Sequence, residues 1–276
     1  MLDSDNMKTL WNASKPLTAV GILMIVAFAF SLLGMLVDPR VITGAPAWLK
    51  PAKFAISTAI YSLTMAWVLT YLPDWPRLKS ITGWITAVVF VLEVAIIDLQ
   101  AARGTTSHFN LSTPLDTSLF AIMGFAIMVV WLTSAAVAAA LFRRQFSDRA
   151  MGWALRLGML LTVLGSATGG LMVRPTDAQL AQAHTTHRLP ISGAHTVGGL
   201  DGGPGMPGTG WSLEHGDLRV PHFVGIHAMQ ILPLFAWLIG RNRPRLVIAA
   251  GFAYAAVFVA LLSQALQGRP FLGGAL

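Results

Sequence analysis

The amino-acid sequence predicts an all-α, polytopic integral membrane protein with seven transmembrane helices. Hydrophobic residues make up 55% of its 276 residues and charged residues only 11%, so too few polar side chains are present to cover a soluble domain. The apolar residues also form continuous runs of about 20, the length that a helix needs to cross the hydrocarbon core of a bilayer. Such continuous runs differ from the alternating segments of a transmembrane β-barrel.

Seven runs have this length, and each is bounded by charged residues, proline or glycine. They are residues 17–37, 52–72, 80–102, 116–142, 151–173, 221–240 and 245–267. Together they predict a single transmembrane domain over residues 1–276. The polar residues 112–116, which precede the fourth run, are typical of a helix N-terminal cap.

One connection is much longer than the others. Residues 174–220 join the fifth and sixth runs and hold nine glycines between Gly193 and Gly216. Loops this long in compact proteins usually cover a site or bind a partner. Its glycine spacing, GxxGxG, is not the dinucleotide-binding pattern GxGxxG, and we therefore expect a Gly-rich cover on the outer side of the membrane.

The Lys and Arg residues of the loops predict the orientation of the chain. Segments 1–16, 73–79, 143–150 and 241–245 hold ten of them, and the much longer segments on the opposite side hold eight. Basic residues gather on the cytoplasmic side, so we expect a multi-pass protein of the cell (inner) membrane with a cytoplasmic N-terminus and an extracytoplasmic C-terminus. The net charge of +7 then reflects topology, with the lipid bilayer as the expected partner and no nucleic acid.

Polar residues gather in the outer halves of the predicted helices. Glu93 lies inside the third run, and an ionisable residue within a span is a functional candidate. We expect a catalytic group of Glu93, Asp98 and Arg103, with Glu93 as a buried acid or base. A structural alternative is that Glu93 pairs with Arg103 or Lys53 and only fastens helices together. The polar residues expected to bind a cofactor or an anionic group are Lys53, Tyr61, Arg219 and Gln230.

The histidines suggest a metal or haem site. All seven lie in the outer loops or the outer half of a span, and three of them, with two acids and an arginine, fall within residues 211–227. Imidazole is a common metal ligand, so we expect ligands to a transition metal or a b-type haem at His108, His215, His222 and His227. His222 and His227 are five residues apart, however, so a shared site would need His108 from another helix or a kink at Gly225. Cysteine is absent, which excludes thiolate ligands and CxxCH haem attachment.

These patterns leave three functions open, and they do not decide whether the protein is an enzyme. The first is a metal- or haem-dependent membrane oxidoreductase that acts from the outer face on a small or lipid-soluble substrate. The second is a non-catalytic subunit that binds other subunits of a larger membrane complex. The third is a proton-coupled transporter with a relay through Glu93 and His227. The cytoplasmic halves of the runs are nearly all apolar, which counts against the transporter.

Overall fold

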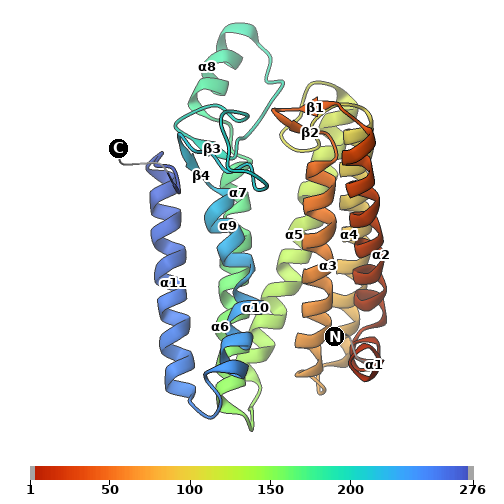
Figure 1. Cartoon of the computed structure of the whole chain (residues 1–276), viewed down its shortest axis with the longest axis vertical. Coiled ribbons are helices and arrows are strands. Elements are labelled where there is room, and N and C mark those ends of the chain that lie inside the picture. The colour runs from red at the N-terminus through yellow and green to blue at the C-terminus, as the bar shows by residue number, and fades with distance from the viewer. Residues whose placement is uncertain (1–3, 273–276) are drawn as a thin grey trace. The chain divides into compact units, whose positions relative to one another are not determined.

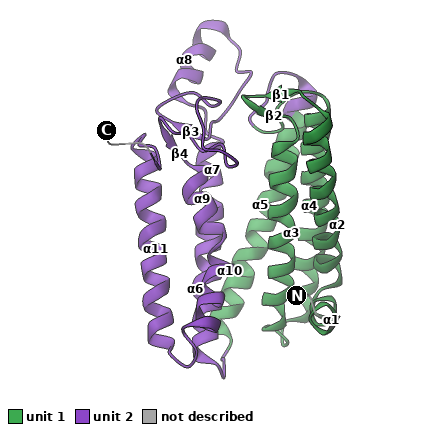
Figure 2. Ribbon diagram, in the orientation of Figure 1, with its two compact units in different colours: residues 1–108, 118–144 green, residues 109–117, 145–276 purple. Residues whose placement is uncertain are grey.

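The computed structural model describes residues 4–272, and in this part of the chain the apolar runs are helices. Six helical segments are long and apolar enough to cross a membrane, and a bent pair of shorter helices makes a seventh span if it is counted as one. The predicted all-α, polytopic membrane fold is therefore confirmed. By its internal contacts the chain divides into two compact units (Figure 2). No observation tests the prediction of one domain, which stays a prediction.

Unit 1 comprises residues 4–108 and 118–144 and is a bundle of long helices (Figure 1). Its elements are α1 (Ser4–Ala13), α2 (Lys15–Val37), β1 (Val41–Ile42), β2 (Ala45–Pro46), α3 (Leu49–Thr70), α4 (Pro76–Ala102) and α5 (Pro114–Arg143), whose first turn belongs to unit 2. The apolar core of this unit includes Val20, Ala59, Phe90 and Val130. Helix α1 was not predicted.

The antiparallel β1–β2 hairpin defines one end of unit 1, which we call the hairpin end. Its turn has positive φ at both Thr43 and Gly44, as a two-residue hairpin of right-handed twist requires. The Arg40 guanidinium bonds the Asp38 carboxylate and donates to the Ala102 carbonyl at 2.9 Å, which ties the hairpin to the last turn of α4. Hydrogen bonds from Arg40 and Trp48 hold the pKa of Asp38 well below its usual value. The opposite end, which carries α1, is the α1 end.

Unit 2 comprises residues 109–117 and 145–272 of the described chain. Its elements are α6 (Arg149–Ala167), α7 (Gly169–Met172), α8 (Asp177–Thr186), β3 (Thr196–Val197), β4 (Gly216–Asp217), α9 (Arg219–Ile226), α10 (Ala228–Leu238) and α11 (Pro244–Leu266). The β3–β4 pair and α8 lie at the end of this unit where α6 finishes and α9 starts (Figure 1). Residues 109–112 join this loop region, because Leu111 donates to the Pro190 carbonyl at 2.8 Å.

Capping side chains start several helices. Thr113 accepts a hydrogen bond from the Asp116 backbone at 3.1 Å and so caps α5, which confirms the cap predicted over residues 112–116. Asp148 caps α6 in the same way through Met151 at 3.0 Å. Thr176 and Gln179 form a capping box that starts α8 inside the long loop, where the sequence predicted a flexible or tightly turning Gly-rich cover and no helix.

The sixth predicted span is broken. Helices α9 and α10 meet at an angle of 45°, with His227 between them. The Thr162 hydroxyl serves both sides of the break, donating to the Ile226 carbonyl at 3.2 Å and accepting from the Met229 backbone at 3.1 Å. Tyr254 of α11 donates to the Val224 carbonyl at 2.6 Å. Backbone groups that a straight helix would have paired internally are thus satisfied by side chains of neighbouring helices.

Candidate functional site

The candidate site of unit 1 is a buried acid beside a histidine. Glu93 is 3% exposed, and its Oε1 atom lies 3.7 Å from Nε2 of His108. That separation suits an ion pair, or one bridging water, better than a direct hydrogen bond. The second carboxylate oxygen, Oε2, has no hydrogen-bond partner in the described part of the chain. The Lys50 side chain acts on Glu93 by charge at longer range.

Aromatic rings and a serine hold the imidazole of His108 in place. Its ring lies 5.3 Å from that of Phe54 and 6.2 Å from that of Phe120. The Ser107 hydroxyl lies 3.1 Å from its Nδ1 atom, which leaves Nε2 on the side of Glu93. The arrangement can bind one proton between a carboxylate and an imidazole, in a surrounding that is otherwise apolar.

Gln100 and Arg103 form a second contact at the hairpin end of unit 1. The Arg103 guanidinium donates to Oε1 of Gln100, and the Gln100 amide approaches the Thr106 carbonyl at 3.5 Å. Glu93 thus lies beside His108, whereas Arg103 bonds Gln100, and the prediction that Glu93, Asp98 and Arg103 form one catalytic group stays a prediction. Asp98 is partly buried, and its Oδ1 atom has no hydrogen-bond partner among the described residues.

Tyr61 has a partner that the sequence did not reveal. Its hydroxyl lies 2.6 Å from that of Ser134 on α5, and its ring stands edge-on to Phe90 at 5.3 Å. Both contacts lie within the core of unit 1. The prediction that Tyr61 and Lys53 bind a cofactor is not tested by these contacts and stays a prediction.

Helix α4 carries a line of buried polar side chains that the sequence analysis missed. Thr82 and Thr86 are each 0% exposed, as is Gln100, and they share the face of Glu93. At about 100° per residue, these four positions fall within about 40° of one another around the helix axis. The half of α4 nearest the α1 end is thus polar on its buried face. The expectation of nearly apolar inner halves is wrong for this helix, because isolated threonines hardly change the hydropathy of a run.

In unit 2, backbone and side-chain oxygens orient His222. Its Nδ1 atom lies 3.0 Å from the Gly165 carbonyl and 3.1 Å from the Thr168 hydroxyl. A carbonyl oxygen only accepts, so the proton of the neutral ring sits on Nδ1 and the lone pair on Nε2. His227 lies at the helix break, where its ring contacts Phe223 at 4.3 Å and the side chain of Gln230 hydrogen-bonds it. The helix does bend here, two residues after Gly225, which was one of the two conditions for a site shared by His222 and His227.

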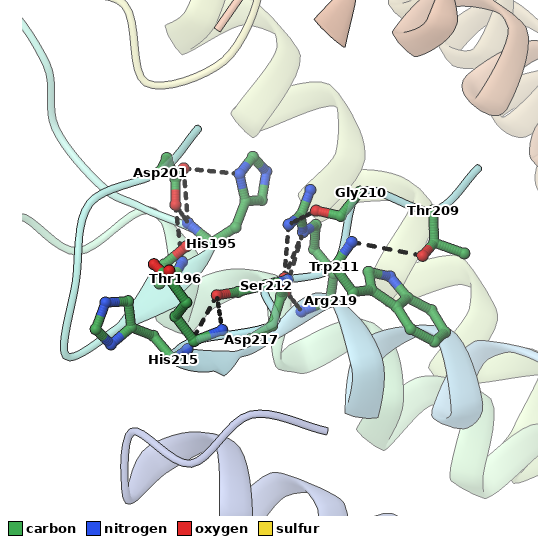
Figure 3. A network of polar contacts seen from close by, with 11 residues as sticks. His195, Thr196, Asp201, Thr209, Gly210, Trp211, Ser212, His215, Asp217 and Arg219 are labelled. Atoms are coloured by element: carbon green, nitrogen blue, oxygen red, sulfur yellow. Dashed lines mark hydrogen bonds and ion pairs between the residues drawn. The ribbon is translucent and has the colours of Figure 1, made fainter. Parts of the chain in front are cut away.

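The long loop of unit 2 is ordered by a network of paired acids (Figure 3). Asp217 accepts from the Arg219 side chain at 2.6 Å and from the Ser212 backbone at 2.8 Å. Arg219 also donates to the Gly210 carbonyl, so its guanidinium is used within the loop. The backbone of His215 donates to the Ser212 hydroxyl at 3.0 Å.

Asp201 is the second acid of this network. It accepts from the His195 ring at 2.8 Å and from the backbone N–H groups of His195 and Thr196. Burial raises the pKa of Asp201, but these hydrogen bonds outweigh burial and hold the pKa well below its usual value. These contacts give the loop a fixed course, so residues 195–219 are more than a flexible cover.

The described residues give no support to the predicted metal site. No group of three or more His, Asp or Glu side chains within residues 4–272 could hold a metal ion. His108 belongs to unit 1, whereas the other three predicted ligands belong to unit 2.

Comparisons of the chain with models of known protein families, with curated proteins and with solved structures find no match. The functional argument therefore depends on the geometry of the two units.

Proposed function

We propose that this multi-pass membrane protein is a proton-coupled transporter, with Glu93 as the proton-binding residue and His108 as its partner. The observation that carries the proposal is the environment of Glu93: it is buried in the core of a membrane-embedded bundle and has one unpaired carboxylate oxygen. Acid and histidine side chains inside membrane spans commonly relay protons in pumps and transporters.

The physical reason is the cost of burying an unpaired charge. A carboxylate in an apolar core is unstable unless a cation or hydrogen-bond donors compensate it, so loss of the proton must be coupled to a change at its partner. His108 can supply that change, because an imidazole can bind and release a proton and this one lies 3.7 Å from the carboxylate. The buried Thr82 and Thr86 remove the objection that the other half of the bundle is apolar.

The proposed orientation places the hairpin end of unit 1 outside the cytoplasm. The N-terminal segment and the loops around Arg77 and Arg144 are rich in basic residues, which favours a cytoplasmic α1 end. Glu93 would then exchange protons with the outer side through His108. The transported substrate is proposed to be small or lipid-soluble.

The test is proton uptake by proteoliposomes containing the full chain. A potassium gradient with valinomycin drives uptake, and a pH-sensitive dye inside the vesicles reports it. We expect the wild-type protein to exceed protein-free vesicles, and Glu93→Gln to lower the rate at least about tenfold because an amide cannot carry the proton. Glu214→Gln, a matched change at an exposed acid of the long loop, should keep the wild-type rate. Equal rates for wild type and Glu93→Gln, or no wild-type uptake, would contradict the proposal.

A second candidate function is favoured by His222. A histidine whose Nδ1–H is held by a backbone carbonyl presents Nε2 as metal ligands usually do, which supports the metal- or haem-dependent oxidoreductase. Metal analysis and an absorption spectrum of purified protein test it. This candidate requires a Soret band or a stoichiometric metal in the wild-type protein. The His222→Ala variant should lose that signal, and the control variant His184→Ala, in the same loop region, should retain it.

A further inference from the structure

The buried polar face of α4 extends over nearly the whole membrane thickness. Thr82, Thr86, Glu93 and Gln100 span 18 residues, which corresponds to about 27 Å of helix. The hydrocarbon core of a bilayer is about 30 Å thick. Helix α4 thus presents more than a single buried acid. Its four polar side chains face the core of unit 1, where each is at most 3% exposed, with buried apolar residues between them.

Three hydroxyls near this line lack the partner that such groups normally have. Serine and threonine in membrane helices usually donate to the carbonyl four residues earlier. Within unit 1, Ser31 and Thr58 do so at 2.9 and 2.8 Å. Thr82, Thr86 and Ser62 do not: their hydroxyl oxygens are buried and have no hydrogen-bond partner in the described part of the chain.

The unpaired hydroxyls lie on the side of Glu93 that leads to the α1 end. Thr86 and Thr82 follow Glu93 down α4, and Ser62 lies on α3, which contributes to the same core. Ser14, between α1 and α2, continues the series: its hydroxyl makes no capping bond and lies against Gly83, where an added Cβ would approach it to 2.6 Å. The missing side chain at Gly83 therefore lets the α1–α2 junction reach α4 beside Thr82.

We infer that the hydroxyls of Ser62, Thr86, Thr82 and Ser14 form a proton route between Glu93 and the α1 end of unit 1, completed by water molecules. This inference rests on the proposed function and deepens it by naming the path. Buried polar groups without protein partners bind ordered water, which makes two to four hydrogen bonds. A buried polar line of side chains that keep their hydroxyls available is therefore suited to water and to protons.

The transfer along this route is a series of balanced exchanges. At each step an oxygen accepts a proton from one neighbour on a lone pair, its own O–H bond breaks, and the proton that it held passes to a lone pair of the next oxygen. The Glu93 carboxylate takes up or gives up one proton at one end, and one proton leaves or enters at the Ser14 end. No oxidant or further reactant takes part.

Valine and alanine substitutions test the route in the proteoliposome assay. Thr86→Val and Thr82→Val keep the shape of the side chain and remove the hydroxyl, and Ser62→Ala does the same on α3. We expect each to slow proton uptake about five- to tenfold, and Thr86→Ser to restore most of the wild-type rate. Thr58→Val and Ser31→Ala remove hydroxyls that already bond their own helix, and they should keep the wild-type rate.

The outcomes separate the route from the proposed function. If Glu93→Gln abolishes uptake while Thr82→Val, Thr86→Val and Ser62→Ala retain it, the route is wrong and the role of Glu93 stands. If Thr86→Ser is as slow as Thr86→Val in correctly folded protein, the hydroxyl is not the reason and the route is also overturned. Wild-type uptake no faster than that of protein-free vesicles overturns the route and the proposed function together.

Discussion

Glu93 in unit 1 and Asp217 in unit 2 are equally buried, but their surroundings are opposite. The Asp217 side chain is 0% exposed and accepts hydrogen bonds from Arg219 and from the Ser212 backbone. The Glu93 side chain is 3% exposed and has one ion-pair partner at 3.7 Å and one unpaired oxygen. Burial alone therefore does not mark a functional acid. The number of partners that the surrounding chain supplies separates an acid that holds a loop together from one that is available for chemistry.

The largest expected loss of stability follows substitution of Asp217. Asp217→Ala removes the carboxylate that accepts hydrogen bonds from the Arg219 guanidinium, which is 30% exposed, and from the Ser212 N–H. The substitution should therefore lower the free energy of unfolding by about 3 kcal/mol. Thermal unfolding in detergent measures this. Glu214→Ala, at an exposed acid of the same loop, is the control and should change stability little. If Asp217→Ala were as stable as the wild type, the contrast between the two acids would disappear.

Acidification should weaken the hydrogen bonds that Asp201, the second paired acid of the loop, accepts. The folded state holds the pKa of Asp201 below its usual value, so its stabilising contribution is complete above about pH 4 and is lost as the pH falls further. Protection of the His195 and Thr196 amides from hydrogen exchange, corrected for intrinsic rates, should drop on the order of tenfold between about pH 6 and about pH 2.5. In Asp201→Asn the protection should be low throughout this range. Protection that does not change with pH in the wild type would contradict the role of the Asp201 carboxylate.

A smaller effect is expected within unit 1, at a polar pair that is satisfied. Tyr61→Phe removes the hydrogen bond to Ser134, which keeps its own bond to the Val130 carbonyl, and should lower the free energy of unfolding by about 1 kcal/mol. The double variant with Ser134→Ala should be more stable than the sum of the two single variants predicts, because both single variants remove the same bond. Full additivity would show that the two hydroxyls do not interact.

The smallest effect on stability is expected at Glu93. Glu93→Gln removes a buried ionisable group that few bonds compensate, so the free energy of unfolding should stay the same or rise by up to about 1 kcal/mol. The measurement is the same unfolding experiment as for Asp217. A loss as large as that of Asp217→Ala would mean that Glu93 mainly fastens helices together. The sequence left that structural role open with Arg103 or Lys53 as the partner, whereas the structure places His108 beside Glu93.

The spans were predictable because length and hydropathy are properties of a continuous segment. The runs 17–37 and 245–267, for example, differ by only a few residues from α2 and α11. The break at His227 was not predicted. Its free backbone groups are satisfied by Thr162 and Tyr254, which come from other helices, so no local pattern indicates it. Helix α8 has a sequence signal, the Thr176–Gln179 capping box, which the glycine content of the loop obscured.

The candidate site was predictable only in part. The burial of Glu93 follows from a charge inside an apolar run, but its pairing with His108 depends on how the segment after α4 folds back. The partner of Tyr61 lies 73 residues away in the chain, and no local pattern indicates it. Thr82 and Thr86 could have been found from their spacing to Glu93, since positions 4, 7 or 11 residues apart share a helix face.

The broken helix has a consequence for how the chain enters the membrane. One hydroxyl that satisfies the break, on Thr162, is synthesised before it, and the other, on Tyr254, is synthesised after it. A ribosome that has just completed α10 has therefore made a segment with a carbonyl at Val224 still awaiting its donor. The bend becomes fully stable only once α11 has been inserted, so stable folding of α9 and α10 depends on a helix that is synthesised after them.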